Sequence, residues 1–356
     1  MKKSLKSILG KIAYSSLGDM ISPISDIVFK YRIRSLKKHF LAEATKEFEN
    51  GSRMGNLEDY KNALKKHWVS YSEYSNQYEF YKKTEEEREE YVPKLKMTYF
   101  YWRYGSGAAK SLFYNKQVFL KTFEKYVHRK WLFTPDASYE DFEQLVSNYD
   151  CIFKPCDEKK GRGIFKTNKN NCKKDRFFYD TCVKNRMLVE QCIESCEELK
   201  AFHPQSLNTI RVVTISNKQK ACVFSGVFRM GVGDNVVDNS HAGGVAAQIN
   251  IEKGIVETEG ADMYGNRFIN HPDSGIRILG FKIPKWETIV ETCCEAAKLT
   301  QNPITGWDVV INSQGDVEFI EGNNDPDCCM LQIRYKAGVK KKLYALIKEY
   351  CGVDMK

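Results

Sequence analysis

The stretch GWDVVINSQGDVEFIEGN, residues 306–323, decides the fold of this chain. Two runs rich in β-branched residues flank the polar segment 312–316, and this pattern is typical of a β-hairpin. Gly315 suits a turn position that requires positive φ, so we expect Gln314 and Gly315 to form a two-residue turn. The sequence therefore predicts two antiparallel strands joined by a tight reversal near the C-terminus.

The register of this hairpin brings acidic groups together. A two-residue turn pairs Ser313 with Asp316 and, further along, Asp308 with Glu321. Asn323 lies two residues beyond Glu321, so both side chains point to the same face of the strand. Clustered carboxylates raise each other's pKa unless a cation neutralises them, and a few hard oxygen ligands beside phosphates suit Mg²⁺. The hairpin therefore predicts a magnesium site; a pair of exposed hairpin acids is the alternative.

A basic loop with glycines follows the strand expected at residues 151–155. The sequence CDEKKGRGI leads out of that strand, and IFKT returns toward it. Glycines let backbone N–H groups approach a phosphate closely, and basic side chains add positive charge. The candidate phosphate ligands are Lys154 at the strand end and, in the loop, Lys159, Lys160, Gly161, Arg162 and Gly163. The spacing is not that of a Walker loop, and an ordinary basic hairpin turn is the alternative.

Further polar groups lie at the ends of expected strands. The strand at 187–193, MLVEQCI, is apolar and then polar, and such a strand can offer its backbone to a purine edge. Arg211 lies near the start of a strand that follows SLNT, and Arg229 closes the next strand. Two arginines beside a metal hairpin suit an anionic substrate or a developing negative charge, although one arginine at a strand end is commonly a surface residue.

The whole chain has the composition of a globular protein of mixed α+β class. Of its 356 residues, 42% are hydrophobic and 28% charged, which is enough apolar surface to bury a core. Residues 35–90 are polar and predict helices, and Gly105 and Gly107 mark a break. Beyond this break, short β-branched runs alternate with helical patterns at 139–149 and 286–300. No run of 18 apolar residues occurs, so we expect no membrane-spanning helix.

The positive charge is concentrated at the N-terminus. Residues 1–40 carry +7 of the formal net charge of +9, so the rest of the chain is nearly neutral and a nucleic-acid-binding surface is not indicated. Apolar residues between Leu5 and Ala13 recur at helical spacing with lysines interleaved. Such a helix can lie on an anionic membrane face, giving peripheral membrane contact through residues 1–40; a helix packed on the rest of the protein is the alternative.

The cysteines are unevenly distributed as well. All 12 lie after residue 150, and none forms a C-x-x-C pair. Two adjacent doublets, Cys293-Cys294 and Cys328-Cys329, suit neither a zinc site nor a simple disulfide frame. We expect reduced, structural thiols and a cytoplasmic protein, with metal binding by cysteine as the alternative.

Taken in order, these segments resemble the ATP-grasp superfamily and, more narrowly, its sugar-transfer-associated family, which is found with surface-polysaccharide assembly. The resemblance covers roughly residues 110–335 and rests on FKPCDEKKGRGI, LVEQCI, HPQSLNTIRVVT, VFRMG, VDNSHAGGV, HPDSG, IPKW, GWDVVI and EFIEGN. It implies an ATP-grasp fold, with two α+β lobes that clasp ATP and a helical N-terminal region. The expected regions are 1–110, helical with a basic start; 111–200, the small lobe with the phosphate loop and adenine hinge; and 201–356, the large lobe with the Mg²⁺ site. The helical region departs from the family pattern, in which the first domain is usually βαβ.

The resemblance also implies roles for individual residues. The contacts with ATP would come from Lys116, Lys154, Lys160, Gly161, Arg162, Gly163, Glu190, Gln191 and Ile193. Of these, the residues from Glu190 onward would hold adenine at the hinge, largely through backbone groups. Mg²⁺ would be held by Asp308, Glu321 and Asn323. Arg211, Arg229 and Asn208 would face the transferred phosphoryl group and the acid substrate.

The implied activity is an ATP- and Mg²⁺-dependent ligation of a carboxylate to an amine through an acyl phosphate. The partners would be a small-molecule or glycan substrate with a carboxylate and an amine co-substrate. We expect an acidic sugar joined to an amino acid or amine in surface-polysaccharide biosynthesis. We expect this enzyme in the cytoplasm, at the inner membrane face if residues 1–40 bind lipid. Two alternatives stay open: a kinase of the same fold that phosphorylates a sugar or lipid hydroxyl, and a non-catalytic nucleotide-binding protein.

Overall fold

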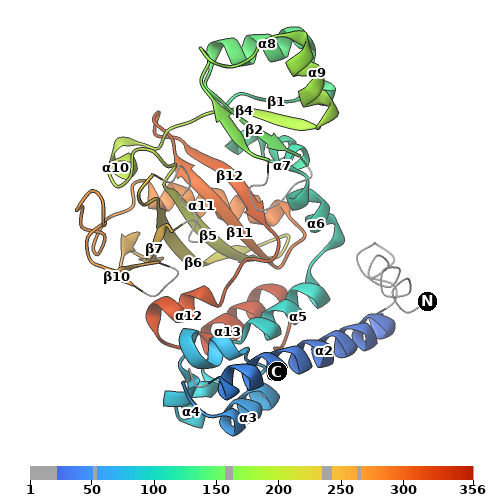
Figure 1. Ribbon diagram of the computed structural model, residues 1–356, viewed down its shortest axis with the longest axis vertical. Helices are drawn as coiled ribbons and strands as arrows, with labels where there is room; N and C mark the ends of the chain where they lie inside the picture. The colour runs from blue at the N-terminus through green and yellow to red at the C-terminus, as the bar shows by residue number, and fades with distance from the viewer. Residues whose placement is uncertain (1–21, 51–53, 157–162, 235–242, 263–265, 356) are drawn as a thin grey trace.

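The computed structural model describes residues 22–50, 54–156, 163–234, 243–262 and 266–355. Figure 1 shows a small sheet with two helices at the top, a large sheet in the middle, and helices from both ends of the chain at the bottom. This arrangement confirms the predicted α+β class with a helical N-terminal region.

The small sheet consists of four antiparallel strands in the order β1-β4-β2-β3. The strands are β1 (Trp131–Phe133), β2 (Cys151–Pro155), β3 (Phe165–Thr167) and β4 (Met187–Gln191). Helices α8 (Tyr139–Asn148) and α9 (Arg176–Lys184) pack against it, because they bury Phe142 and Tyr179 in one cluster with Phe153. We call this sheet with its two helices the small lobe.

The large sheet has eight strands, of which seven follow the order β10-β9-β7-β6-β5-β11-β12 while β8 pairs with β7. The strands are β5 (Thr209–Ser216), β6 (Ala221–Met230), β7 (Val245–Asn250), β8 (Ile255–Val256), β9 (Gly260–Ala261), β10 (Arg267–Phe268), β11 (Ile304–Ile311) and β12 (Val317–Asn323). Neighbouring strands are antiparallel. Every residue of β11 is buried, so both faces of the sheet are covered at its centre.

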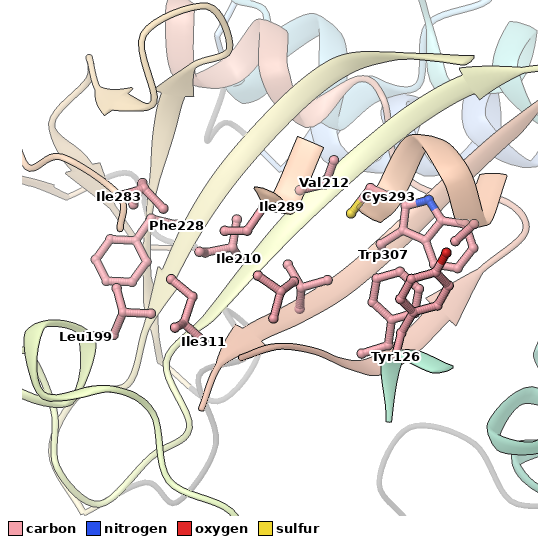
Figure 2. Close-up of a cluster of buried hydrophobic side chains, with 14 of the residues drawn as sticks. Tyr126, Leu199, Ile210, Val212, Phe228, Ile283, Ile289, Cys293, Trp307 and Ile311 are labelled. Atoms are coloured by element: carbon pink, nitrogen blue, oxygen red, sulfur yellow. The ribbon is translucent and has the colours of Figure 1, made fainter. Parts of the chain in front are cut away.

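Helix α11 (Trp286–Leu299) covers one face of the large sheet, and we call the two together the large lobe. Figure 2 shows part of the core between them, in which Ile289 of the helix and Ile210 of β5 belong to one buried cluster. Trp307 of β11 stacks on Phe319 of β12 with ring centroids 4.9 Å apart. Burial of a large apolar side chain contributes about 1.5–3 kcal/mol, so this core fixes the strands that carry the site.

Helices from both ends of the chain lie together on the other side of the large sheet, below it in Figure 1. They are α2 (Ser22–Glu49), α3 (Leu57–His67), α4 (Glu85–Glu89), α5 (Lys94–Tyr104), α12 (Met330–Tyr335) and α13 (Lys340–Cys351). Val213 and Ile215 of β5 share a buried cluster with Tyr74 and Tyr78 of the N-terminal region and with Leu343 of α13. The burial of these two tyrosines shows that they serve packing.

Shorter elements connect these layers. They are the helices α6 (Gly107–Tyr114), α7 (Lys116–Thr122) and α10 (Glu197–Lys200), and single helical turns at Glu73–Gln77, Phe80–Lys82, Glu124–Tyr126 and Thr134–Asp136. Asn115 begins α7 by accepting a hydrogen bond from the N–H of Val118 at 3.1 Å, which fixes the start of the helix that carries Lys116.

The predicted C-terminal hairpin is present, but its turn is longer than predicted. The N–H of Gly315 donates to the carbonyl of Asn312 at 2.8 Å, and the N–H of Asn312 donates to the carbonyl of Asp316 at 2.9 Å. Asn312 therefore faces Asp316 across a three-residue loop, and the predicted two-residue turn with Ser313 opposite Asp316 is wrong. The side chain of Asn312 explains the wider loop, because its Oδ1 accepts from the N–H groups of Gln314 and Asp316.

A β-bulge restores the predicted pairing further along the hairpin. Val309 faces Phe319, but Asp308 faces Glu321, so Ile320 is an extra residue on β12. The bulge offsets the one-residue shift introduced by the longer turn. The prediction that Asp308 and Glu321 lie opposite each other is therefore confirmed.

Two further expectations concern the thiols and the membrane. All 12 cysteines are free thiols, as expected. Among the described residues, no helix combines the length and the apolar character needed to cross a membrane. The basic helix expected between Leu5 and Ala13 lies outside the described residues.

Candidate functional site

The acidic groups of the hairpin meet two arginines from neighbouring strands. Asp308 of β11 faces Arg211 of β5 on one side and Glu321 of β12 on the other. The Asp308 carboxylate accepts hydrogen bonds from Nε and Nη2 of Arg211, the latter at 2.8 Å, and from Nη1 of Arg229 at 3.1 Å. Directly opposite residues of antiparallel strands have neighbouring side chains, so the strand register itself creates this cluster.

The two carboxylates ionise differently because their partners differ. Burial alone raises the pKa of Asp308, but the charges of Arg211 and Arg229 outweigh it and hold the pKa at about 2. Loss of hydration among the surrounding groups raises the pKa of Glu321, and the charge of Asp308 raises it further, whereas Arg211, Lys154 and Arg229 act to lower it. The Glu321 side chain keeps solvent-accessible surface, so it is the carboxylate of the pair that is open to a ligand.

Asn323 completes the predicted metal-binding set. It follows Glu321 by two residues on β12, and within the described part of the chain its buried Nδ2 atom has no hydrogen-bond partner. The oxygen and the nitrogen of an amide are assigned from their hydrogen-bond partners, so the Asn323 amide can equally present its oxygen at this position. The amide then offers an unpaired oxygen on the face of the strand that carries Glu321. Hard oxygen donors of this kind suit Mg²⁺, which keeps several waters and takes other ligands from phosphates. The side chains therefore fit the metal that the sequence predicts.

Two lysines lie near this cluster from the other side. Nζ of Lys154, at the end of β2, binds the carboxylate of Glu190 at 2.7 Å. Lys116, at the start of α7, donates from Nζ to the carbonyl of Pro155 at 3.1 Å. Burial lowers the pKa of Lys116, and the charge of Glu321 raises it. Lys154 is joined through Glu190 and Arg129 to Glu318 of β12, the strand that carries the predicted metal ligands Glu321 and Asn323.

The hinge strand β4 contributes a side chain to this region. Glu190 is only 2% exposed, and its carboxylate binds Nε of Arg129 at 2.5 Å as well as Lys154. Burial alone raises the pKa of Glu190, but Arg129 and Lys154 outweigh it and lower the pKa to about 2. Arg129 also donates from Nη1 to Glu318 of β12 at 2.8 Å. This buried network joins the small lobe to the large lobe, a role that goes beyond the backbone contacts expected of Glu190.

The remaining hinge residues lie at the end of β4. The N–H of Gln191 donates to the carbonyl of Lys130 at 2.8 Å, whereas the N–H of Ile193 makes no hydrogen bond to any described residue. A cavity of about 340 Å³ opens beside Ile193, with Cys192 and Lys166 in its wall. A larger cavity of about 580 Å³ lies between β1 and α8, but none of the predicted site residues lines it. The smaller cavity is the one that borders the predicted hinge.

Asn208, predicted to face the transferred phosphoryl group and the acid substrate, makes its hydrogen bonds within the protein. It is fully buried, and its Nδ2 donates to the carbonyls of Leu199 at 2.8 Å and His203 at 3.0 Å. Its Oδ1 accepts from Oγ of Ser206 at 3.0 Å and from the N–H of Gly231 at 3.1 Å. Both amide protons and both acceptor positions are used, so no polar atom remains for a substrate. Asn208 thereby links the segment 199–206 to the backbone at Gly231.

Most of the predicted phosphate loop lies outside the described residues. That segment contains Lys159, Lys160, Gly161 and Arg162. Gly163 is described with a φ of +69°, a conformation that side chains other than glycine's rarely adopt. The backbone at this position therefore requires glycine, as a loop close to a phosphate would.

Two charged residues of the site are not evident from the sequence. Arg129 stands in a basic segment without a recognisable motif, and only the structure shows that it is buried between Glu190 and Glu318. Glu318 lies between the apolar residues Val317 and Phe319 and is fully buried. A buried acid in a hydrophobic run needs a cationic partner, and that is the one signal in the sequence.

The chain is similar to one protein family and to several solved structures. The sequence profile of the sugar-transfer-associated ATP-grasp family matches residues 98–348. No curated protein matches the chain. Among solved structures, the ATP-grasp ligase PsnB in complex with a minimal precursor, Mg and ADP is 14% identical, with a TM-score of 0.43 over 70% of this chain and 62% of its own.

Two other solved structures are similar at the same level. N5-carboxyaminoimidazole ribonucleotide synthetase from Thermotoga maritima is 10% identical, with a TM-score of 0.41 over 72% of this chain and 56% of its own. An L-amino acid ligase from Bacillus licheniformis is 13% identical, with a TM-score of 0.38 over 68% of this chain and 45% of its own. The chain thus spans less than two thirds of the length of these proteins.

The profile match covers most of the chain, from α5 to α13. It confirms the predicted family and, with it, the ATP-grasp fold. The protein belongs to the sugar-transfer-associated ATP-grasp family.

Proposed function

We propose that this protein is an ATP- and Mg²⁺-dependent ligase that joins an amine to a carboxylate through an acyl phosphate. One observation carries the proposal: Lys154 binds Glu190, and Arg129 joins Glu190 to β12, the strand on which Glu321 faces Asp308. Phosphoryl transfer requires cationic groups around the phosphates and carboxylates that hold a metal. Here this network of ion pairs joins the two sets of groups.

The nucleotide would be held mainly by groups of the small-lobe side. Lys116 and Lys154 would bind phosphate oxygens, and the backbone at Gln191 and Ile193 would bind the adenine. Glu190 holds Lys154 at the end of β2, so the ammonium group is positioned before the nucleotide arrives. The predicted loop of Lys160, Gly161, Arg162 and Gly163 would cover the phosphates.

The large lobe would hold the metal and the acid substrate. Asp308, Glu321 and Asn323 would hold Mg²⁺, which when bound neutralises phosphate charge that would otherwise repel a carboxylate. Arg211 and Arg229 lie directly beside these ligands through their bonds to Asp308. They would orient the incoming carboxylate and offset the charge that develops on the transferred phosphoryl group.

The proposed reaction has two steps, and every bond that forms in them is matched by a bond that breaks. The substrate carboxylate forms a bond to the γ-phosphorus of ATP as the bond to the bridging oxygen breaks, giving an acyl phosphate and ADP. The amine nitrogen then bonds to the carbonyl carbon, inorganic phosphate leaves, and the amine releases a proton. Positioning and charge neutralisation account for most of the protein's contribution, because phosphoryl transfer requires little covalent help.

We infer that the acid is an acidic sugar, joined to an amino acid or another amine in surface-polysaccharide biosynthesis. The family description, which links these proteins to sugar transfer, supports this substrate class. The concentration of positive charge in residues 1–40 suits work at the inner face of an anionic membrane, with peripheral contact by a cytoplasmic enzyme.

The test supplies purified protein with Mg-ATP, a panel of uronic acids, and hydroxylamine in place of the unknown amine. Hydroxylamine converts an acyl phosphate to a hydroxamate, so ADP release and hydroxamate formation should rise together with an effective acid. ADP release without hydroxamate, and with phosphate retained on the sugar, would indicate a kinase instead. If the protein is folded and yet no acid of the panel increases ADP release, the proposal is contradicted.

A further inference from the structure

A row of side chains crosses the large sheet from the metal ligands toward β10. Thr209 of β5 faces Arg229 of β6, and Arg229 faces Ala246 of β7. Ala246 faces Ala261 of β9, which in turn faces Arg267 of β10. Partners in antiparallel strands point to the same face, so Arg229 and Arg267 share a face and two alanines separate them. Three strand spacings place their backbones about 14 Å apart.

Helix α12 brings a further arginine to this row. The helix packs against β7, the strand between the two arginines. Arg267 donates from Nη1 to the carbonyl of Arg334 at 3.4 Å and from Nη2 to the carbonyl of Ile333 at 3.3 Å. These bonds hold the last turn of α12 beside Arg267. Arg334 thereby joins the arginines of the sheet face.

Arg334 has no acidic partner in the part of the chain that the structure describes. Its guanidinium donates one hydrogen bond, from Nη1 to the carbonyl of Met330 at 3.4 Å. Burial lowers the pKa of Arg334 to about 10; Asp327 acts to raise it, and the charges of Arg229 and Arg267 lower it further. A part-buried guanidinium without an acidic partner is well placed to bind an anion through charged hydrogen bonds.

Two acids near this row are bound by other cationic side chains. Asp308 is already bound by Arg211 and Arg229. Asp327, the one acid whose charge favours Arg334, is bound by Nζ of Lys94 at 2.7 Å. Neither of these two acids is therefore paired with Arg334.

We propose that the acid substrate carries a second anionic group, a carboxylate or a phosphate, which Arg334 and Arg267 bind at the end of the row away from the metal ligands. One carboxylate is activated beside Arg211 and Arg229, and the second anion neutralises Arg334. The site thereby selects dianionic acids over monoanionic ones of similar size. This inference rests on the ligase function proposed above and specifies its substrate class.

The test compares matched acids that differ in one anionic group. The pairs are glucuronate with glucaric acid at neutral pH, glucuronate with glucuronate 1-phosphate, and butyrate with glutarate. Each is added to the protein with Mg²⁺ and a non-hydrolysable ATP analogue, and the rise in Tm is measured. The hydroxamate assay on the same pairs gives kcat/KM.

The variants are Arg334→Gln, Arg334→Lys and, as a control, Arg176→Gln. Arg176 lies on α9, is exposed and pairs with Asp180 at 3.3 Å.

The wild-type protein should prefer at least one dianion over its monoanionic match by about 10- to 100-fold in kcat/KM, because hydrogen bonds between charged groups are stronger than those between neutral groups. Arg334→Gln should abolish this preference while it leaves monoanions little affected. Arg334→Lys should keep part of the preference, and Arg176→Gln all of it. Without any ligand, Arg334→Gln should unfold at a Tm equal to or higher than that of the wild type, since it removes a charge that has no acidic partner among the described residues. A purely structural arginine would give a lower Tm.

Two results would overturn the inference. One is a wild-type protein that no dianion of the panel stabilises more than its monoanionic match. The other is a dianion preference that survives in Arg334→Gln. Failure of the ligase function is a distinct result: dianions would stabilise the protein through Arg334, yet no acid would give ADP release or hydroxamate.

Discussion

Asp308 lies directly opposite Glu321 across β11 and β12, although the loop that joins the strands has one residue more than a two-residue turn. The extra residue at Ile320 compensates for the longer loop. Because the bulge lies beside the two acids, the loop and the bulge together set which carboxylates meet. The pairing of these two proposed metal ligands thus depends on two irregularities that cancel.

Asp308→Asn should strongly destabilise the protein without ligands. The buried carboxylate binds both Arg211 and Arg229, so the amide would remove the negative charge that these two guanidinium groups share. Breaking a buried pair in this way typically costs about 3–5 kcal/mol. Urea unfolding at pH 7 measures the change, with Asp316→Asn, an exposed acid of the same hairpin, as the matched control. A loss equal to that of the control would contradict the described pairing.

Glu321→Gln should behave in the opposite way. The pKa of Glu321 is raised by lost hydration and by the charge of Asp308, so its ionised form is disfavoured in the ligand-free protein. The neutral amide removes this repulsion, and the free energy of unfolding should equal or exceed that of the wild type. The same urea experiment checks this, and a clear loss of stability would show that Glu321 has a structural partner.

The Glu190 network should make folding stability depend on acid pH. The folded pKa of Glu190 is about 2, below its ordinary value of 4.5, so its contribution is fully present above about pH 4.5 and is lost as the pH falls toward 2. The pKa difference corresponds to about 3 kcal/mol. Glu190→Gln should lower the stability at pH 7 and flatten its decline between pH 5 and 2. The measurement is the free energy of unfolding across this pH range, with Glu194→Gln, which changes an exposed acid, as the control. If the stability of Glu190→Gln declined with pH as steeply as that of the wild type and the control, the described network would be contradicted.

Asn208→Ala separates a structural role from a catalytic one. The amide makes four buried hydrogen bonds to the protein, and an unsatisfied buried partner costs about 1–3 kcal/mol. The variant should therefore have a lower Tm, while the turnover of the folded fraction stays within a few-fold of the wild type at a temperature well below that Tm. Turnover that falls by two orders of magnitude or more with an unchanged Tm would restore the catalytic role. Asn148→Ala, which removes an exposed amide on α8, is the control.

The sequence is sufficient to predict most of the fold because its local signals agree. The β-branched runs of β5, β6 and β12 are bounded by turn residues; Arg211 lies near the start of β5 and Arg229 near the end of β6, as predicted. The turn of the hairpin is predicted less well, because two local preferences compete there. Gly315 suits a two-residue turn, but the side chain of Asn312 binds two backbone N–H groups and stabilises a wider loop. Only the three-dimensional structure shows which preference prevails.

The site is predictable where one strand or hairpin supplies it, and not where distant segments meet. Asp308 and Glu321 follow from the pairing of one hairpin. Arg129, by contrast, binds Glu190 and Glu318, which are 61 and 189 residues away in the chain and belong to different sheets. No local pattern encodes such a contact, and for the same reason the sequence does not single out Arg334.

The measurement that tests the central claim most directly is the binding of ATP by calorimetry with and without Mg²⁺, in the wild type and in Glu321→Gln. If Asp308, Glu321 and Asn323 hold the metal against the nucleotide, Mg²⁺ should tighten ATP binding to the wild type by at least about 10-fold, and the variant should lose this gain while remaining folded. Equal affinity with and without Mg²⁺ in the wild type, or an undiminished gain in Glu321→Gln, would contradict the account.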